Sequence, residues 1–285
     1  MREIRIGTRG SLLAEAQAQI IADEILKAWP DSHITLVKIT TTGDKNMTPF
    51  SSDPAGIKGM FTLEIEQALA NHEIDFAVHS LKDLPANMNP SLPIVAYSCR
   101  ADPRDALILN EQNHDGAIGS SSLRRRLQLE RLYPERKILP IRGNITTRIK
   151  RLDSGEFGGL ILAAAGLSRL GLSERITKIF TTDEILPAPG QGILACQGRL
   201  GEDYTYLACV NDSDSRDSAL AERSFARTLN SGCNVPAGAY AEVHNETLTL
   251  KGLYIHDGRF RRAELSGKRT DAEAMGKRLA EEVMK

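Results

Sequence analysis

The chain has 285 residues, 41% of them hydrophobic and 26% charged, which is typical of globular proteins and leaves room for two or three domains. The formal net charge of −1 excludes bulk attraction to nucleic acid or to an anionic membrane, so any anion site must come from local clustering of charge. No apolar run approaches the length of a membrane span, and the N-terminus lacks the apolar core of a signal peptide. We therefore expect a cytoplasmic protein that binds neither nucleic acid nor membrane.

Four cysteines are spread widely along the chain, at positions 99, 196, 209 and 233. They form no Cys-x-x-Cys pair, and no histidine cluster accompanies them. A disulfide framework or a zinc site is therefore not expected, and we predict free thiols and no bound metal.

Strand patterns alternate with helical patterns over the first two thirds of the chain. In chain order we predict a strand at 4–7, a helix at 12–27, a strand at 34–39, a helix at 60–70 and strands at 76–78, 93–97 and 106–109. A helix at 123–132, a strand at 138–141, a helix at 146–152, a strand at 160–163 and a helical region around Leu167 follow. This alternation favours α/β layers with at least partly parallel sheets. The polar stretch 42–58 is long for a plain connection, which favours a lid or a functional loop.

Two breaks that contain proline divide the alternating part, near 101–103 and 187–192. Two crossings at these breaks would give two α/β lobes joined by paired hinges. After Asp212 the pattern changes to a helix at 218–229, strands at 247–255 and 261–266, and a final helix at 271–284. We place the first lobe at 1–98 with 190–211, the second lobe at 99–189, and a small α+β domain at 212–285.

The strongest local signal is Gly119-Ser120-Ser121-Ser122-Leu123-Arg124-Arg125-Arg126, where a strand ends, hydroxyl residues follow and a helix begins. The free N–H groups and the dipole of a helix N-terminus attract anions, and the forked donors of arginine suit carboxylate or phosphate. An N-capped helix with a solvated basic face explains the same pattern about equally well.

Further arginines lie at or just after predicted strand ends, at Arg9, Arg142, Arg148 and Arg169. Each of them alone is most simply a surface residue. Because ligands of α/β folds bind beyond the carboxyl ends of the strands, all of these arginines could face one cleft.

Two further segments contain groups that could take part in chemistry. His79-Ser80-Leu81-Lys82-Asp83 follows a buried strand, where Lys82 could bind an anion and Asp83 could act in acid–base steps. The residues alone favour a solvated turn with a structural salt bridge, and a satisfied core histidine at position 79. Cys233 lies in a loop after a helix, where nearby cations would make an exposed thiol nucleophilic, although an unremarkable cysteine is the simpler interpretation.

Together these segments resemble the porphobilinogen deaminases, also called hydroxymethylbilane synthases. The matching stretches cover nearly the whole chain. They are Gly7 to Ala14, Gly59 to Phe61, Val78 to Pro85, Asp102 to Asp105, Gly119 to Arg125, Leu139 to Arg148, Ala163 to Leu172, Leu186 to Gly192, and Gly232 to Pro236. The resemblance implies two periplasmic-binding-protein-like α/β lobes joined by hinges, plus a small α+β C-terminal domain, in a monomer.

The resemblance also implies an activity. The family joins four porphobilinogen molecules head to tail, with loss of ammonia, into the linear tetrapyrrole hydroxymethylbilane. The chain grows on a dipyrromethane cofactor, which is made from the same substrate and bound to a cysteine as a thioether. The matching residues are Cys233 for attachment of the cofactor and Asp83 for catalysis. A carboxylate at Asp83 would stabilise the cations of the reaction and shuttle a proton.

Each pyrrole carries an acetate and a propionate, so the growing chain is a polyanion and needs several cationic partners. The residues implied to hold or position cofactor and substrate are Arg9, Ser11, Gln17, Lys58, Phe61, Ser80, Lys82, Ser120, Ser121, Ser122, Arg124, Arg125, Arg142, Arg148, Arg169 and Gln191. The stretch 42–58 matches a flexible loop of the family. Gln197 departs from the pattern, because relatives often have Glu there, and its role stays open.

Two other classes of protein fit parts of the pattern. A two-lobed binding protein or effector domain would share the lobes and hinges but would need neither Cys233 nor Asp83. A thiol hydrolase would use Cys233 as a nucleophile, but none of the six histidines lies in a motif that supports one.

Overall fold

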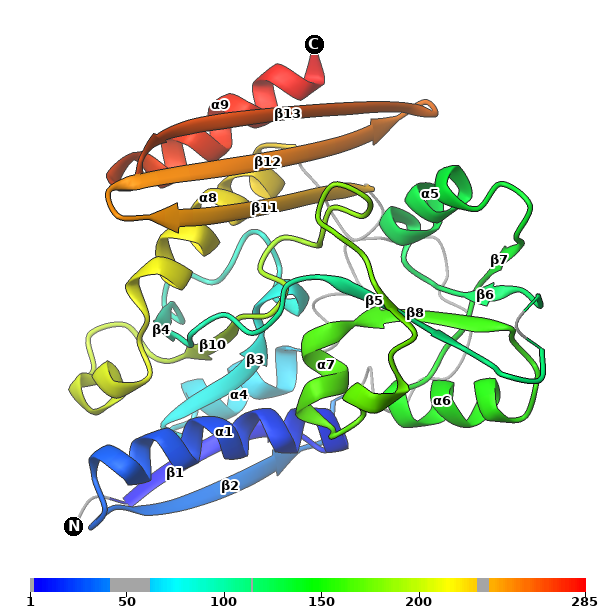
Figure 1. Ribbon diagram of the computed structural model, residues 1–285. Coiled ribbons are helices and arrows are strands. Elements are labelled where there is room, and N and C mark those ends of the chain that lie inside the picture. The colour runs from blue at the N-terminus through cyan, green and yellow to red at the C-terminus, as the bar shows by residue number, and fades with distance from the viewer. Residues whose placement is uncertain (1–2, 42–61, 114, 230–235) are drawn as a thin grey trace.

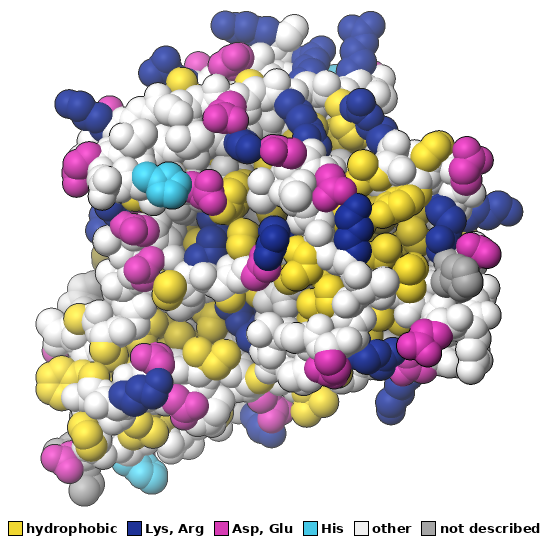
Figure 2. Space-filling view, viewed as in Figure 1, with side chains coloured by type: hydrophobic (Ala, Val, Ile, Leu, Met, Phe, Trp, Pro, Cys, Tyr) yellow, Lys and Arg dark blue, Asp and Glu magenta, His cyan; other side chains and the backbone are white. Residues whose placement is uncertain are grey.

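The computed structural model describes residues 3–41, 62–113, 115–229 and 236–285. The described residues form two α/β lobes and a smaller α+β domain (Figure 1). None of the helices in these ranges is long and apolar enough to cross a membrane. On the face shown in Figure 2, basic and acidic side chains are interspersed over most of the surface.

The first lobe is built on a five-stranded sheet of order β2-β1-β3-β10-β4. Its strands are β1 (Glu3–Arg9), β2 (His33–Ile39), β3 (Phe76–Ser80), β4 (Ile94–Tyr97) and β10 (Leu194–Gln197). β1 runs parallel to β2 and β3, whereas β10 runs antiparallel to β3 and β4. Its helices are α1 (Leu12–Ala28) and α4 (Leu63–Ala70), and the short 3-10 helices are η1 (Leu81–Asp83) and η3 (Thr205–Cys209). Alternate apolar residues of β1, such as Ile4 and Ile6, pack against Ile21 and Ile25 of α1.

The second lobe has a sheet of order β7-β6-β8-β5-β9. Its strands are β5 (Asp105–Leu109), β6 (Ile118–Gly119), β7 (Ile138–Leu139), β8 (Gly159–Ala163) and β9 (Lys178–Ile179). Its helices are α5 (Leu123–Leu132), α6 (Ile145–Asp153), α7 (Ala164–Arg169) and the 3-10 helix η2 (Ser173–Arg175).

The two sheets share one arrangement. In the order of the sheet, three parallel strands are followed by two strands that pair antiparallel. The fourth strand in this order is β10 in the first sheet and β5 in the second. In the chain, each of these two strands is the first strand after a passage between the lobes. The chain makes these passages at 98–104 and at 180–193, and the two predicted breaks lie within them. The predicted periplasmic-binding-protein-like pair of lobes is thereby confirmed, while the proposed domain boundaries stay a prediction.

The C-terminal domain is an antiparallel sheet of order β11-β12-β13 with helices on one face. Its elements are α8 (Ser213–Thr228), β11 (Ala237–His244), β12 (Thr247–His256), β13 (Arg259–Lys268), the 3-10 helix η4 (Arg269–Asp271) and α9 (Ala272–Met284). The helices approach the sheet closely at Gly252, where an added Cβ would lie 2.6 Å from Cε2 of Phe225. Glycine at this position therefore allows α8 to pack directly on β12.

Three sequence-based expectations differ from the structure. The described part of the helix predicted at 60–70 begins at Leu63. The helix predicted from residue 218 begins at Ser213, because the side chain of Asp212 caps it by accepting a hydrogen bond from Ser215 N at 2.7 Å. The strand β11 was not predicted, because the small residues that begin it lack a β-branched pattern, yet it pairs with β12 along its whole length.

Candidate active site

Lys82 and Asp83 lie on η1, directly after β3. The flanking residues Leu81 and Leu84 are buried in an apolar cluster, and Leu81 N donates to Ile193 O at 3.0 Å. These contacts fix the turn and leave Lys82 half-buried and Asp83 exposed. The alternation of apolar and charged residues thus presents two charged groups at the end of a central strand.

Gln191 connects this turn to the second lobe. Lys82 Nζ donates to Gln191 Oε1 at 3.4 Å. The other end of the amide, Gln191 Nε2, donates to Pro103 O and to Asp105 Oδ1, both at 2.7 Å. Because Gln191 is fully buried in the second passage between the lobes, it holds Lys82 and Asp105 in a fixed relation.

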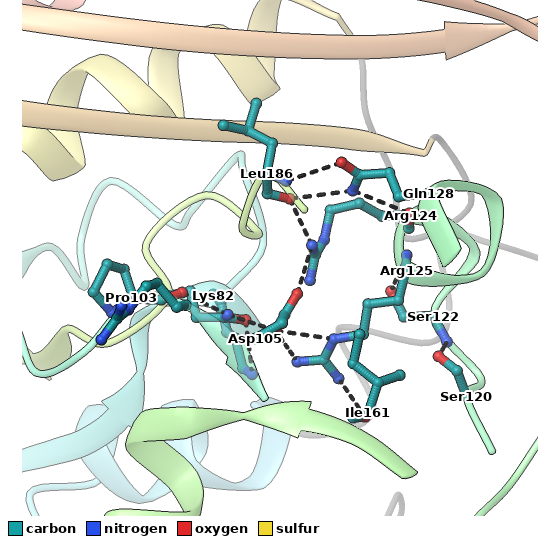
Figure 3. A network of polar contacts seen from close by, with 12 residues as sticks. Lys82, Pro103, Asp105, Ser120, Ser122, Arg124, Arg125, Gln128, Ile161 and Leu186 are labelled. Carbon is teal, nitrogen blue, oxygen red and sulfur yellow. Dashed lines mark hydrogen bonds and ion pairs between the residues drawn. The ribbon is translucent and has the colours of Figure 1, made fainter. Parts of the chain in front are cut away.

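Asp105, the first residue of β5, lies between two guanidinium groups (Figure 3). Its Oδ2 accepts from Arg124 Nη1 at 2.9 Å, and its Oδ1 accepts from Arg125 Nη2 at 2.7 Å. Burial alone would raise the pKa of Asp105, but the charges of Arg124 and Arg125, with hydrogen bonds from Arg125 and Gln191, lower it well below its usual value. Asp105 is therefore a permanently ionised structural group.

The structure gives Arg124 and Arg125 an environment that neither interpretation of the sequence included. Both residues are buried, so they do not form a solvated basic face. Arg124 also donates to Leu186 O at 2.6 Å, and Arg125 is held against Asp105 by two of its nitrogens. One carboxylate nevertheless faces two guanidiniums, so net positive charge remains at this point.

Replacing Asp105 with asparagine should strongly destabilise the protein. The change leaves two buried guanidiniums with no compensating charge, which costs about 3–5 kcal/mol when one partner of a buried ion pair is removed. Asp102→Asn is a matched control, because Asp102 pairs with Arg104 at 2.7 Å where both side chains are partly exposed. The control should cost only about 0–1 kcal/mol. Urea unfolding midpoints of the two variants check this expectation, and equal shifts would contradict it.

Four basic and two acidic side chains form one electrostatic group between the lobes, called here the inter-lobe cluster. Its members are Lys82, Asp83, Asp105, Arg124, Arg125 and Arg148. Burial, followed by the charge of Arg125, lowers the pKa of Lys82 to about 8. Burial and then Arg125 also lower the pKa of Arg148 to about 10, while the charge of Asp83 acts in the opposite direction. The cationic members therefore repel one another, which favours the binding of an anion among them.

Arg9 and Arg169 are the last residues of β1 and α7, and Arg142 lies after the end of β7. Arg169 Nη2 donates to Gly192 O, in the second passage, at 2.6 Å, and burial lowers the pKa of Arg169 to about 10. The charge of Arg9 acts on His79 at the end of β3. Arg142 is exposed. The structure thus brings Arg9 and Arg169 to segments next to those of the cluster.

The predicted hydroxyl residues mainly complete the local backbone. Ser122 caps α5 by accepting from Arg125 N at 3.4 Å, and Ser120 Oγ accepts from Ser122 N at 3.3 Å. Ser121 Oγ donates to Ile141 O at 2.5 Å and accepts from Ile141 N at 3.1 Å, which joins the ends of β6 and β7. The predicted N-cap is confirmed, and the cap orders the first turn of the helix that holds both buried arginines.

Ser11, Gln17 and Ser80 lie in the first lobe. Ser11 caps α1 by accepting from Ala14 N at 3.3 Å. Gln17 is buried and donates from Nε2 to Ser80 Oγ at 2.7 Å, which links α1 to the end of β3. Lys58, Phe61 and Cys233 lie outside the described residues, as does the stretch 42–58.

His79 and Gln197 are buried side chains on adjacent strands of the first sheet. Gln197 Nε2 donates to Leu92 O at 3.0 Å and to Glu66 Oε1 at 3.3 Å. His79 is the core histidine that was expected. Burial lowers the pKa of His79 to about 4, although a side-chain hydrogen bond with Gln197 acts to raise it, so this imidazole is neutral at pH 7.

A second buried ion pair, absent from the sequence-based site, joins the passages to the C-terminal domain. Glu222 of α8 is fully buried and accepts from Arg100 Nη2 at 2.8 Å, Gly190 N at 2.6 Å and Ala241 N at 2.7 Å. Burial raises the pKa of Glu222, against the opposing effects of Arg100 and the backbone donors. The sequence did contain a signal for this buried carboxylate, because Glu222 lies on the apolar face of its helix between Ala221 and Phe225.

Comparison with known proteins decides the family. Residues 4–206 match the family model described as "Porphobilinogen deaminase, dipyromethane cofactor binding domain", and residues 217–285 match "Porphobilinogen deaminase, C-terminal domain". The chain belongs to the porphobilinogen deaminase family. Porphobilinogen deaminase of Ruminiclostridium josui is 47% identical over 99% of this chain and 98% of its own, and that of Acetivibrio thermocellus is 46% identical over the same shares.

The family assignment made from the sequence motifs is therefore confirmed. Porphobilinogen deaminases are transferases of tetrapyrrole and heme biosynthesis. They join four porphobilinogen molecules into the linear tetrapyrrole hydroxymethylbilane, and their first domain binds a dipyrromethane cofactor. The inter-lobe cluster lies within the part of the chain that matches this cofactor-binding domain.

Proposed function

We propose that this member of the porphobilinogen deaminase family uses Asp83 as its catalytic carboxylate and carries its dipyrromethane on Cys233 through a thioether. The observation that supports the proposal best is the inter-lobe cluster, in which the exposed carboxylate of Asp83 interacts with the charges of Lys82 from its own turn and of Arg148 from the second lobe. We further propose that the enzyme is a cytoplasmic monomer.

The chemistry of this site fits a chain of pyrroles. Every ring carries two carboxylates, and the inter-lobe cluster has four basic members against two acidic ones when Lys82 is protonated. Arg9 and Arg169 extend the basic groups toward the first strand and the second passage. The bound dipyrromethane would supply the terminal pyrrole ring to which the first substrate is joined. In this proposal Lys82, Arg148, Arg9 and Arg169 bind carboxylates, while Arg124 and Arg125 maintain the positive potential.

Asp83 has the properties that the substrate chemistry requires. Loss of ammonia from the aminomethyl group of porphobilinogen leaves a cation, and the attacking ring becomes cationic before it loses its α-proton. A fixed carboxylate beside the pyrrole N–H groups stabilises both cations and can accept the proton. Lys82 and Arg148 flank this carboxylate and would hold the acetate and propionate groups, so that the reacting carbons face Asp83.

The proposed role of Cys233 is supported by the residues that follow its segment in the chain. β11 begins at Ala237, and Ala239 N donates to Pro187 O at 3.1 Å. The neighbouring carbonyl, Leu186 O, accepts from Arg124 Nη1 at 2.6 Å. The chain therefore leaves the Cys233 segment beside the second passage and close to the inter-lobe cluster.

Three measurements on the purified protein test this function. Ehrlich's reagent should give the colour of a bound dipyrromethane, intact mass should exceed the sequence mass by a two-pyrrole adduct, and added porphobilinogen should yield hydroxymethylbilane. A protein that binds porphobilinogen reversibly without adduct or product would instead support the two-lobed binding protein. Light scattering during size-exclusion chromatography tests the monomer.

The affinity for substrate should weaken as the pH rises through the pKa of Lys82. Because this pKa is about 8, Lys82 is mostly charged at pH 7 and mostly neutral at pH 9. A charge-assisted hydrogen bond contributes roughly 1.5–3 kcal/mol, so KM for porphobilinogen should rise about tenfold over this range, with a smaller change in kcat. Lys82→Arg keeps its charge at pH 9 and should show a flatter profile. An equal rise of KM in both enzymes would assign the titration to the substrate or to another group.

A further inference from the structure

Arg223 of α8 contacts the backbone just after η1, the 3-10 helix that ends at Asp83. Its Nη2 donates to Pro85 O at 2.8 Å and to Ala86 O at 3.4 Å. These carbonyls lie two and three residues after Asp83, which itself ends η1. The contact therefore joins the C-terminal domain to the segment of the first lobe that carries the proposed catalytic carboxylate.

The same helix contacts the turn at a second point. Ala219, one helical turn before Arg223, is fully buried in one apolar cluster with Leu81 and Leu84. Leu84 follows Asp83 directly and is only 2% exposed. Apolar packing thus fixes the turn from inside, while the guanidinium fixes its outgoing backbone.

The environment of Arg223 makes this hydrogen bond effective. The side chain is half-buried, and burial lowers its pKa, although the guanidinium stays charged at neutral pH. A hydrogen bond from a charged donor in a partly desolvated place is stronger than one in open water. Both hydrogen bonds come from one nitrogen, Nη2, so a single charged group holds two successive carbonyls of the outgoing backbone.

We propose that Arg223 is a positioning residue for Asp83, a role that rests on the proposed function of Asp83. Through Arg223, α8 fixes the position and the direction of the backbone that follows Asp83, and thereby the orientation of the Asp83 carboxylate. The segment that carries Cys233 follows the end of α8 directly, at residue 230. One helix therefore contacts the backbone that follows Asp83 and also precedes, in the chain, the segment that contains Cys233.

The first test compares Arg223→Gln and Arg223→Lys with Arg227→Gln. Arg227 lies one helical turn further along α8 and is exposed. Its Nη2 lies 3.6 Å from Oε2 of Glu273, a residue of α9 rather than of the segment that carries Asp83. Small displacements of a catalytic group cost large factors in rate. Arg223→Gln should therefore lower kcat about tenfold, with KM within about twofold and the two-pyrrole adduct intact in the mass spectrum. Arg223→Lys should recover part of this loss, and Arg227→Gln should match wild type. Unchanged kcat in Arg223→Gln would overturn the proposal.

A double-mutant cycle separates positioning from general stability. In an Asp83→Asn background no carboxylate remains to be positioned, so Arg223→Gln should change the single-turnover rate less than about twofold. The same tenfold loss in both backgrounds would overturn the proposed role. If Arg223→Gln does not fold, the cycle is run with Arg223→Lys under the same criteria. Near-normal turnover of Asp83→Asn alone would instead refute the proposed role of Asp83, and the two failures are thereby distinguished.

Discussion

Asp83→Asn is expected to lower kcat at least about 100-fold while the fold and the bound cofactor are retained, given that one preorganised electrostatic contact is commonly worth this factor. The amide keeps the shape of the side chain but can neither stabilise a cation fully nor accept the α-proton. Because Asp83 is exposed, the change should shift the free energy of unfolding by no more than about 0.5 kcal/mol. Steady-state turnover of porphobilinogen, intact mass and urea unfolding measure the three quantities.

Asp31→Asn is the control for this substitution, because Asp31 is also exposed but follows the end of α1 in the first lobe. It should leave turnover, mass and stability unchanged. Turnover of Asp83→Asn within about threefold of wild type would remove Asp83 from the catalytic role, since that factor is far below the roughly 100-fold expected of a preorganised electrostatic contact. A KM effect without a kcat effect would identify Asp83 as a binding residue only.

Cys233→Ala should yield a folded protein without the two-pyrrole adduct and without measurable turnover. The proposed thioether holds the first two rings through every cycle, and alanine offers no sulfur to which they can be attached. Intact mass should therefore equal the sequence mass, and Ehrlich's reagent should give no colour. Addition of porphobilinogen should produce no hydroxymethylbilane.

Two exposed cysteines within the described residues provide controls for this experiment. Cys99 and Cys209 are free and exposed, and each can be replaced by alanine without loss of a buried group. Both variants should keep the adduct and full activity. An adduct of unchanged mass on Cys233→Ala would place the attachment elsewhere and refute the proposed anchor.

The sequence by itself determined the family, most of the elements in their order, and the candidates for chemistry. Long segments with clear periodicity, such as α1 and α5, were predicted to within one or two residues. The motif around Ser122 correctly predicted a capped helix N-terminus, because capping depends on residues that are close in the chain. The two breaks that contain proline likewise predicted where the chain passes between the lobes.

Other features were decided by contacts between residues far apart in the sequence. Arg124 and Arg125 looked like either a solvated face or a ligand site, and only the tertiary structure pairs them with Asp105 from a different strand. Glu222 and Arg223 lie side by side on α8, yet one is buried against Arg100 and the other holds the turn that bears Asp83. Local patterns specify helices, strands and caps, because those interactions span a few residues. The partners of a buried charge are set by how the lobes and the C-terminal domain pack, and this packing determines which arginines are held in buried ion pairs.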